Sequence, residues 1–268
     1  MTRLSLAHLT RLHLSPEQLV RQGAAAGFDA VGLRVHPAEV GALCYPLPNA
    51  SPEHRRLRSL LKQEGMRINE VEFVPLTPGL TPVSLAGMLE SAAELGATSL
   101  LCCGDDPDDA RLVGNFSEIC ELARPFGIRV DLEFMRWRQI SNLRKASAVI
   151  RAAGQPNSGI MLDILHLFRT EGSFEELPDA IRYIHAVQLC DAPLRSPPEH
   201  EIISEGRERR QVPGAGEFPL KEILGMVSPT VSLSAEVPNI MNTSDDYFRK
   251  INDETRKIVQ AVHVWEGV

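Results

Sequence analysis

The sequence predicts a closed (β/α)8 barrel, the TIM-barrel class of α/β fold, formed by residues 1–268 as a single domain. Eight apolar runs of strand length alternate with amphipathic stretches, which is typical of a parallel sheet whose strands are joined by helices. The length of 268 residues is close to the roughly 250 that such a barrel needs. An open doubly wound sheet would need a glycine-rich turn after its first strand, and residues 8–12 contain no glycine.

The expected strands are short and cover residues 4–8, 30–35, 68–74, 99–103, 128–134, 159–163, 185–189 and 231–237. Two helices have clear start signals, because Ser15 and Ser51 are each followed directly by proline and Gln18 completes a capping box with Ser15. Further helices are expected over residues 83–95, 116–126, 140–153, 174–183, 220–227 and 245–264. The acidic stretch 105–109 lacks the spacing and the glycine of a calcium loop, so we expect it to lead into a helix N-terminus.

Composition narrows the choice of partner and compartment. A net charge of −7 and the lack of any run rich in lysine and arginine exclude nucleic acid as the expected partner. No apolar stretch approaches the length of a membrane span or of a signal-peptide core, and the five scattered cysteines suit a reducing compartment. We therefore expect a cytoplasmic protein with no membrane partner, which acts on a small molecule and has an apolar helix face that would allow a homodimer.

Four oxygen-bearing side chains stand at the carboxyl ends of four successive expected strands: Glu133, Asp163, Gln188 and Glu236. The carboxyl ends of the strands in such a barrel meet at one face, where the chemistry of these enzymes takes place. Buried carboxylates are unfavourable unless something pairs with them. Three acids and one amide that converge on a point would suit a hard divalent cation. The sequence therefore predicts a metal site at this end of the barrel.

Several short segments, in their order and spacing, resemble the sugar phosphate isomerase/epimerase family, the xylose isomerase-like barrels. The resemblance spans nearly the whole chain, beginning with residues 26–34. It is strongest in residues 132–134 (LEF), 162–169 (LDILHLFR), 187–193 (VQLCDAP), 212–220 (VPGAGEFPL) and 234–237 (SAEV). Residues 188–193 look especially like the bacterial 3-dehydroshikimate dehydratases, which are lyases within this superfamily.

The resemblance implies that Glu133, Asp163 and Glu236 bind one divalent metal ion. Gln188 is a departure, since many members, the ketose epimerases included, have a histidine at this position. We do not expect His185 to replace that histidine, because an offset of three residues in a strand turns its side chain to the opposite face. An amide oxygen makes the site harder, which favours Mg²⁺ or Mn²⁺ over Zn²⁺.

Three further residues are candidates for contact with the substrate. His166 follows Asp163 by three residues and is expected to hydrogen-bond the substrate or relay a proton, with a purely structural histidine as the alternative. His8, at the end of the first strand, is expected to offer a substrate hydrogen bond. Glu72 alternates with apolar residues and has the same parity as Glu70, so one of the two lines the barrel mouth or forms a salt bridge under its rim.

The longest loop after a strand, residues 191–212, carries a group of arginines. Within the resemblance, Arg207 and Arg210 match the positions of substrate-contacting arginines. The planar fork of arginine is suited to a carboxylate or a phosphate, although residues 205–210 are also typical of a solvated charged segment. Trp137 closely follows Glu133 and is a candidate apolar wall over the substrate, or it packs against neighbouring loops.

The reaction that these residues favour is metal-dependent isomerisation or epimerisation of a small polyhydroxy carbonyl compound through an enediolate-type intermediate. Glu133 and Glu236 would face opposite sides of one substrate carbon, as two-base epimerisation requires, and His166 would assist. The alternative is a dehydratase of a cyclic hydroxy ketone such as 3-dehydroshikimate, which Gln188 and its surrounding segment favour. A barrel that merely binds a ligand is the remaining possibility, whereas a trinuclear zinc endonuclease would need more histidines and a basic face.

Overall fold

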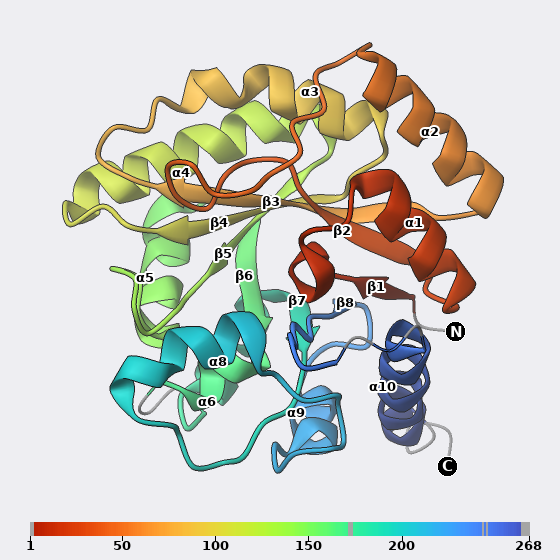
Figure 1. Cartoon of the computed structure of the whole chain (residues 1–268). Coiled ribbons are helices and arrows are strands. Elements are labelled where there is room, and N and C mark those ends of the chain that lie inside the picture. Colours follow the sequence, from red (N-terminus) through yellow and green to blue (C-terminus); the bar gives the residue numbers. More distant parts are fainter. Residues whose placement is uncertain (1–2, 171–173, 243, 245, 264–268) are drawn as a thin grey trace.

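The computed structural model describes residues 3–170, 174–242, 244 and 246–263. Its eight parallel strands close into a barrel in sequence order, which confirms the expected fold class (Figure 1). The strands are β1 (Leu4–Leu6), β2 (Ala30–Arg34), β3 (Arg67–Leu76), β4 (Ser99–Gly104), β5 (Arg129–Glu133), β6 (Ser158–Asp163), β7 (Ile184–Leu189) and β8 (Ser232–Ala235). Most of their residues are buried, as expected for strands covered on both faces.

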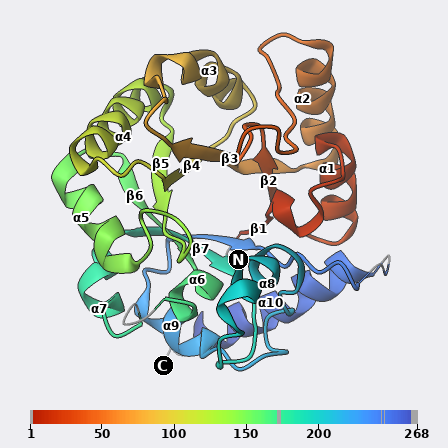
Figure 2. The same cartoon turned by 60° about the vertical axis from the view of Figure 1, so that its left-hand side comes forward.

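Helices surround the strands, and Figure 2 shows them distributed around the outside of the barrel. The longer ones are α1 (Pro16–Ala25), α2 (Pro52–Glu64), α3 (Ala86–Glu94), α4 (Asp109–Ala123), α5 (Leu143–Ala153) and α10 (Tyr247–His263). Four short helices complete the set: α6 (Ile164–Phe168), α7 (Leu177–Ala180), α8 (Ile202–Glu208) and α9 (Leu220–Met226). Among the described residues, no helix combines the length and apolar character needed to cross a membrane.

The helix starts follow their capping residues. Ser15 and Gln18 form both hydrogen bonds of the expected capping box, and the Ser51 hydroxyl accepts from the N–H of His54. The predicted helix 116–126 starts too late, because Asp108 in the acidic stretch accepts from the N–H of Arg111 and begins α4 at Asp109. Helix 140–153 was placed too early for a similar reason, since Asn142 caps α5.

The remaining predicted helices are also shortened or divided at their ends. Residues 82–85 form a 3-10 turn before α3, and the expected helix 174–183 contains only α7 and a 3-10 turn over residues 181–183. The expected helix 220–227 ends one residue earlier, at Met226. The predicted last helix agrees with α10, but its expected first and last residues, 245 and 264, lie outside the described part of the chain.

The inside of the barrel holds a small apolar cluster formed by Phe73, Leu101, Cys103, Met135, Met161 and Ala186. Leu101 and Cys103 pair in register with Asp131 and Glu133, so the same face of the sheet also carries acidic side chains. His185 also lies on this inner face, contrary to the parity argument. A register shift after Ile160 separates its strand pairing from that of Met161, and the imidazole Nδ1 of His185 lies 3.5 Å from Asp131 Oδ1.

Glu70 lies deeper in the barrel than the cavity at its mouth, and it is fully buried. The hydroxyl of Ser234 donates to its Oε1 over 3.2 Å, and the amide of Asn69 donates to Oε2. The barrel makes room for this side chain opposite Gly32, where a Cβ atom would lie 2.3 Å from Glu70 Oε1. Burial, followed by the charge of Glu72, raises the pKa of Glu70 to about 8.

Gly32→Ala should destabilise the barrel by about 1–3 kcal/mol, because the added methyl group collides with a buried and hydrogen-bonded carboxyl. Urea denaturation measures the effect. Gly114→Ala is the matched control, since Gly114 is exposed in the middle of α4 with open space around a Cβ, and it should stabilise by about 1 kcal/mol. If both substitutions changed the free energy of unfolding by the same amount, the close packing of Glu70 against Gly32 would be contradicted.

Because of Glu70, the free energy of unfolding of the protein should decrease as the pH rises from about 5 to about 8. The unfolded carboxyl releases its proton near 4.5 and the folded one near 8, so between these values the folded protein holds more protons and loses stability with increasing pH. Glu70→Gln removes this titration. We expect wild type and variant to match near pH 5, and the variant to gain an advantage of on the order of 1 kcal/mol per pH unit above it. If the free energies of unfolding of wild type and variant differed by a constant amount across that range, Glu70 could not be protonated in the folded protein.

Candidate metal and substrate site

The four predicted metal ligands lie at adjacent strand ends. Glu133 ends β5, Asp163 ends β6 and Gln188 is the penultimate residue of β7, while Glu236 directly follows β8. Asp163 pairs in register with Gln188, and Gln188 pairs with Ser234 two residues before Glu236. All four side chains are buried. Closure of the sheet therefore brings together residues that are more than 100 positions apart in the sequence.

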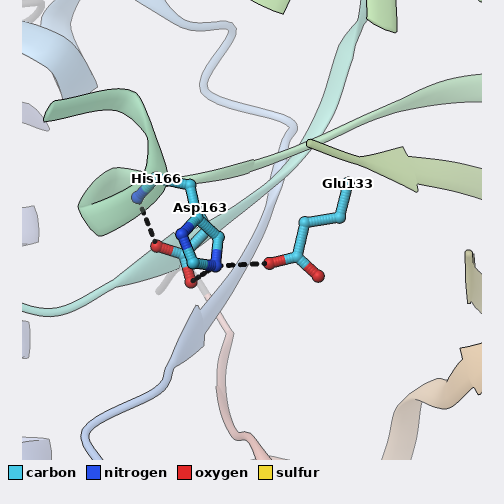
Figure 3. A group of neighbouring side chains, drawn as sticks. All are labelled: Glu133, Asp163 and His166. Atoms are coloured by element: carbon cyan, nitrogen blue, oxygen red, sulfur yellow. Dashed lines mark hydrogen bonds and ion pairs between the residues drawn. The ribbon is translucent and has the colours of Figure 1, made fainter. Parts of the chain in front are cut away.

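His166 joins this group from α6. Its Nε2 lies 3.4 Å from Glu133 Oε1 and 3.9 Å from Asp163 Oδ2, and Figure 3 shows the imidazole between the two carboxylates. One ligand atom from each of the three residues lies within 4.8 Å of the other two. Asp163 fixes this arrangement locally, because its Oδ1 accepts from the N–H groups of Leu165 and His166 and so caps the helix that carries His166.

Arg210 supplies the positive charge of the cluster. Its Nη1 donates to Asp163 Oδ2 over 2.6 Å, and its Nη2 lies 3.0 Å from Glu236 Oε2. The Nε atom donates to the carbonyl of Gly206. Arg210 was expected to contact the substrate directly. In the structure its guanidinium is fully engaged with two of the prospective metal ligands and is 1% exposed, so it stabilises the ligand set itself.

Burial and mutual repulsion shift the pKa values of the three carboxyl groups, and not all in the same direction. The pKa of Glu133 is raised well above its ordinary value by burial and then by the charges of Asp163 and Glu236. Burial also raises the pKa of Glu236 to about 8. Burial acts in the same direction on Asp163, but the charge and hydrogen bond of Arg210, together with the contacts to His166, outweigh it and lower the pKa of that carboxyl. Burial lowers the pKa of His166 to about 4, so its imidazole is neutral at physiological pH.

Gln188 provides the clearest sign that the cluster suits a cation. Its amide nitrogen donates to Glu236 Oε1 over 3.2 Å, whereas its buried amide oxygen has no hydrogen-bond partner among the described residues. An unpaired buried acceptor is unfavourable, and a divalent ion would satisfy it. Three carboxylates and one amide oxygen form a ligand set that fits such an ion, and the neutral imidazole of His166 lies beside them.

A cavity of about 150 Å³ opens above these residues. Four arginines, four glutamates and His166 supply most of its polar wall, and Trp137 packs edge-on against the His166 ring at a centroid distance of 5.0 Å. The apolar part of the wall is formed by Leu9, Leu12, Ala38, Ala42, Leu43, Phe73, Met135 and Trp137. The site is therefore a compact pocket whose wall combines charged and apolar side chains.

Of the other residues predicted to contact the substrate, Glu72 and Arg207 lie at the cavity and His8 does not. Glu72 lines the cavity, and neither of its buried oxygens has a hydrogen-bond partner among the described residues. Arg207 lies at the rim, where its Nη1 is 3.5 Å from Glu39 Oε1. His8 is fully buried, its Nε2 contacts the carbonyl of Leu14, and its Nδ1 accepts from the N–H of Arg34. With both ring nitrogens in use, His8 has no group left for a substrate.

Arg34 lines the cavity and was not predicted as a site residue. It is the last residue of β2, so its side chain leaves a strand at the same end of the barrel as the predicted metal ligands. The position at a strand's carboxyl end, which predicts Glu133 and Asp163 as site residues, is the sequence signal that also marks Arg34.

A family model described as the xylose isomerase-like TIM barrel matches residues 20–240. The chain belongs to this family. Among curated members, a 3-dehydroshikimate dehydratase of Pseudomonas aeruginosa is 29% identical over 261 residues, covering 91% of this chain and 38% of that protein. An inosose isomerase of Halalkalibacterium halodurans is 25% identical over 159 residues, covering 55% of this chain and 54% of that protein. This xylose isomerase-like chain thus spans about two fifths of the length of the dehydratase and half that of the isomerase.

The solved structures of the family share the same barrel. The IolI protein, solved with a zinc atom bound, is 18% identical to this chain, with a TM-score of 0.78 and coverage of 97% of this chain and 99% of that one. At this level of identity the similarity shows the fold, and the ligand set of the present xylose isomerase-like chain must be tested on its own residues.

Gln188→Ala should weaken the binding of Mn²⁺ at least about tenfold, because it removes the unpaired amide oxygen from the ligand set. Isothermal titration calorimetry of the metal-free protein measures the change. Gln155→Ala is the control, since Gln155 hydrogen-bonds Ser117 and Glu121 of α4 on the outside of the barrel and does not line the cavity. Unchanged Mn²⁺ affinity in Gln188→Ala would remove this residue from the ligand set.

Proposed function

We propose that this protein is a divalent-metal-dependent enzyme that removes a proton from a carbon next to the carbonyl group of a small polyhydroxy compound. The observation that carries the proposal is the buried cluster of Glu133, Asp163, Gln188 and Glu236, with the unpaired amide oxygen of Gln188 directed at no protein partner. These residues would hold the ion, with His166 beside them. When bound, a divalent ion polarises the carbonyl and stabilises the negative charge that develops on its oxygen.

The side chains of this protein have separate roles in such a reaction. Glu133 and Glu236 come from β5 and from the end of β8, which places two carboxyl groups with raised pKa values at different sides of the barrel mouth. Each can take or return a proton at the substrate carbon. Neutral His166 can donate to a substrate oxygen, and Trp137 shields this contact from water.

Isomerisation or epimerisation is the outcome that this pair of carboxyl groups supports best, since a proton removed from one face can be returned from the other or to a neighbouring carbon. The inosose isomerase relative is consistent with this chemistry. Zn²⁺ is less suited to the oxygen-rich ligand set than Mg²⁺ or Mn²⁺.

Dehydration of a cyclic hydroxy ketone is the second candidate, and two observations favour it. Gln188 replaces the histidine expected of a ketose epimerase, and the relative that matches 91% of this chain is a 3-dehydroshikimate dehydratase. The first step would be the same removal of a proton. The reaction would then diverge, because the neighbouring hydroxyl leaves as water before a proton returns to the carbon.

Proton NMR in D₂O distinguishes these outcomes, with Mn²⁺- or Mg²⁺-loaded protein and a panel of ketoses, inososes and 3-dehydroshikimate. Deuterium on a carbon next to a carbonyl, or a new epimer, would support isomerisation. New vinylic or aromatic protons would support dehydration. The absence of both reactions across the panel would leave a barrel that only binds its ligand and would refute the catalytic proposal for these substrates.

Glu133→Gln should lower kcat/KM at least about 100-fold on whichever substrate turns over, because the amide cannot accept the proton. Circular dichroism should show an unchanged fold, since Gln is isosteric with the protonated acid. Glu90→Gln, an exposed substitution on α3, is the control and should keep full activity. A near-normal rate in Glu133→Gln would mean that another group removes the proton.

A further inference from the structure

Two of the four arginines that line the cavity are held by hydrogen bonds: Arg210 by Asp163 and the carbonyl of Gly206, and Arg138 by Asp105 and the carbonyl of Ala38. The side chains of the other two, Arg34 and Arg207, form no hydrogen bond within the described part of the chain, and each lies 3.5 Å from one glutamate. Arg207 is at the rim with 43% of its side chain exposed, whereas Arg34 is 7% exposed. Of these four, Arg34 is therefore the buried guanidinium whose donors are not used in hydrogen bonds.

The structure holds Arg34 in place although its guanidinium forms no hydrogen bond among the described residues. The residue is 7% exposed and ends β2, where its backbone N–H donates to His8 Nδ1 and its carbonyl accepts from the N–H of Tyr45. Its guanidinium lies over the ring of Phe73, with the Cζ atom 5.3 Å from the ring centroid. A cation fixed in this way on a rigid strand end is suited to binding rather than to a flexible surface role.

Glu72 does not use the donors of this guanidinium. The closest approach between them is 3.5 Å, from Arg34 Nε to Glu72 Oε1, and neither atom forms a hydrogen bond within the described part of the chain. Glu72 offsets the charge of Arg34, but the two terminal nitrogens of the fork remain without an acceptor. The terminal nitrogens are not among the buried atoms that lack a partner, so these donors, on a residue that lines the cavity, are accessible to a ligand that supplies the acceptors.

We infer that Arg34 binds a carboxylate group of the substrate through the two terminal nitrogens of its guanidinium, across the cavity from Glu133, Asp163, Gln188 and Glu236. This inference rests on the proposed function and specifies its substrate class as a small hydroxy acid that carries a carbonyl group. A planar guanidinium fork matches a planar carboxylate with two parallel hydrogen bonds. A neutral ketose would leave the fork unpaired.

The dimensions and lining of the cavity favour a compact, ring-shaped acid over a phosphorylated sugar. Its volume of about 150 Å³ is small for a ligand pocket, and eight apolar side chains contribute to its wall. Arg138 and Arg210 are engaged in hydrogen bonds and Arg207 lies exposed at the rim, so the buried part of the wall offers one free fork, which suits a monoanion better than a doubly charged phosphate. The substrate's oxygens would face the metal ligands, and its carboxylate would face β2.

The first test measures binding alone, so that it does not depend on turnover. Calorimetry compares 3,4-dihydroxybenzoate with its neutral amide, 3,4-dihydroxybenzamide, on Mg²⁺-loaded protein, with ribulose 5-phosphate as the phosphate-bearing compound. We expect the acid to bind roughly 10- to 100-fold more tightly than the amide, as charge-assisted hydrogen bonds to a guanidinium predict. Equal binding of acid and amide, binding of neither, or tighter binding of the phosphate would overturn the inference.

Variants then assign the preference to Arg34. Arg34→Met, which keeps the apolar length and loses the fork, should reduce the acid-over-amide preference to less than about threefold. Arg34→Lys should retain only part of it, because an ammonium group is a point charge. Arg58→Met, an exposed substitution on α2, is the control and should keep the full preference. A full preference in Arg34→Met, with unchanged thermal stability and Mg²⁺ affinity, would also overturn the inference.

The result can be separated from the fate of the proposed reaction. If the acid is preferred through Arg34 but no compound in the D₂O panel reacts, the carboxylate site stands and the catalytic proposal fails. If neutral ketoses or inososes turn over and no acid preference exists, the reaction stands and the carboxylate site fails.

Discussion

The burial of three carboxylates within one small volume is the constraint on which the rest of the site depends. Glu133, Asp163 and Glu236 cannot all carry charge there without a cation, because the interior screens their repulsion poorly. The raised pKa values of Glu133 and Glu236 and the lowered pKa of Asp163 reflect this repulsion, because protonation of the first two carboxyl groups leaves fewer charges in the cluster. Arg210 resolves part of it. Together, three carboxylates, one guanidinium and one divalent ion would be electrically neutral, so the charge of the cluster suits an ion of that charge.

The loop after β7 is folded to deliver Arg210 to this cluster. Asp191 organises the loop, since its carboxylate accepts from the N–H groups of Ala192, Gly214 and Phe218. Gly216 lies so close that an added Cβ would be 2.3 Å from Asp191 Oδ1. Backbone bonds between Asp191 and Gln211 then hold the strand-like segment beside Arg210. The segment VPGAGEFPL, which stood out in the sequence, therefore positions the arginine and does not itself line the cavity.

The sequence was sufficient for the barrel and for the floor of the site because both follow from simple periodicities. Strand parity and the position at a strand's carboxyl end place Glu133, Asp163 and Gln188 correctly without any tertiary information. Local capping fixed the start of α1 in the same way. Parity failed at His185, since a strand irregularity in β7 turns this residue into the barrel. The role of Arg210 was equally out of reach, because it depends on how a loop of some 20 residues folds back over the mouth.

The two halves of the barrel mouth contribute different chemistry. The predicted oxygen ligands lie at the carboxyl ends of β5 to β8, whereas β2 ends in Arg34 and β3 carries Glu72 into the same cavity. A substrate bound between the halves would present its oxygens to one side and its charged end to the other, so its orientation is fixed before any proton moves. Orientation of this kind matters more than affinity, because the carboxyl groups of Glu133 and Glu236 can act only on the carbon placed between them. Because Arg34 is the last residue of β2 and not part of an exposed loop, a substrate group bound to it would be held at a fixed place relative to those carboxyl groups.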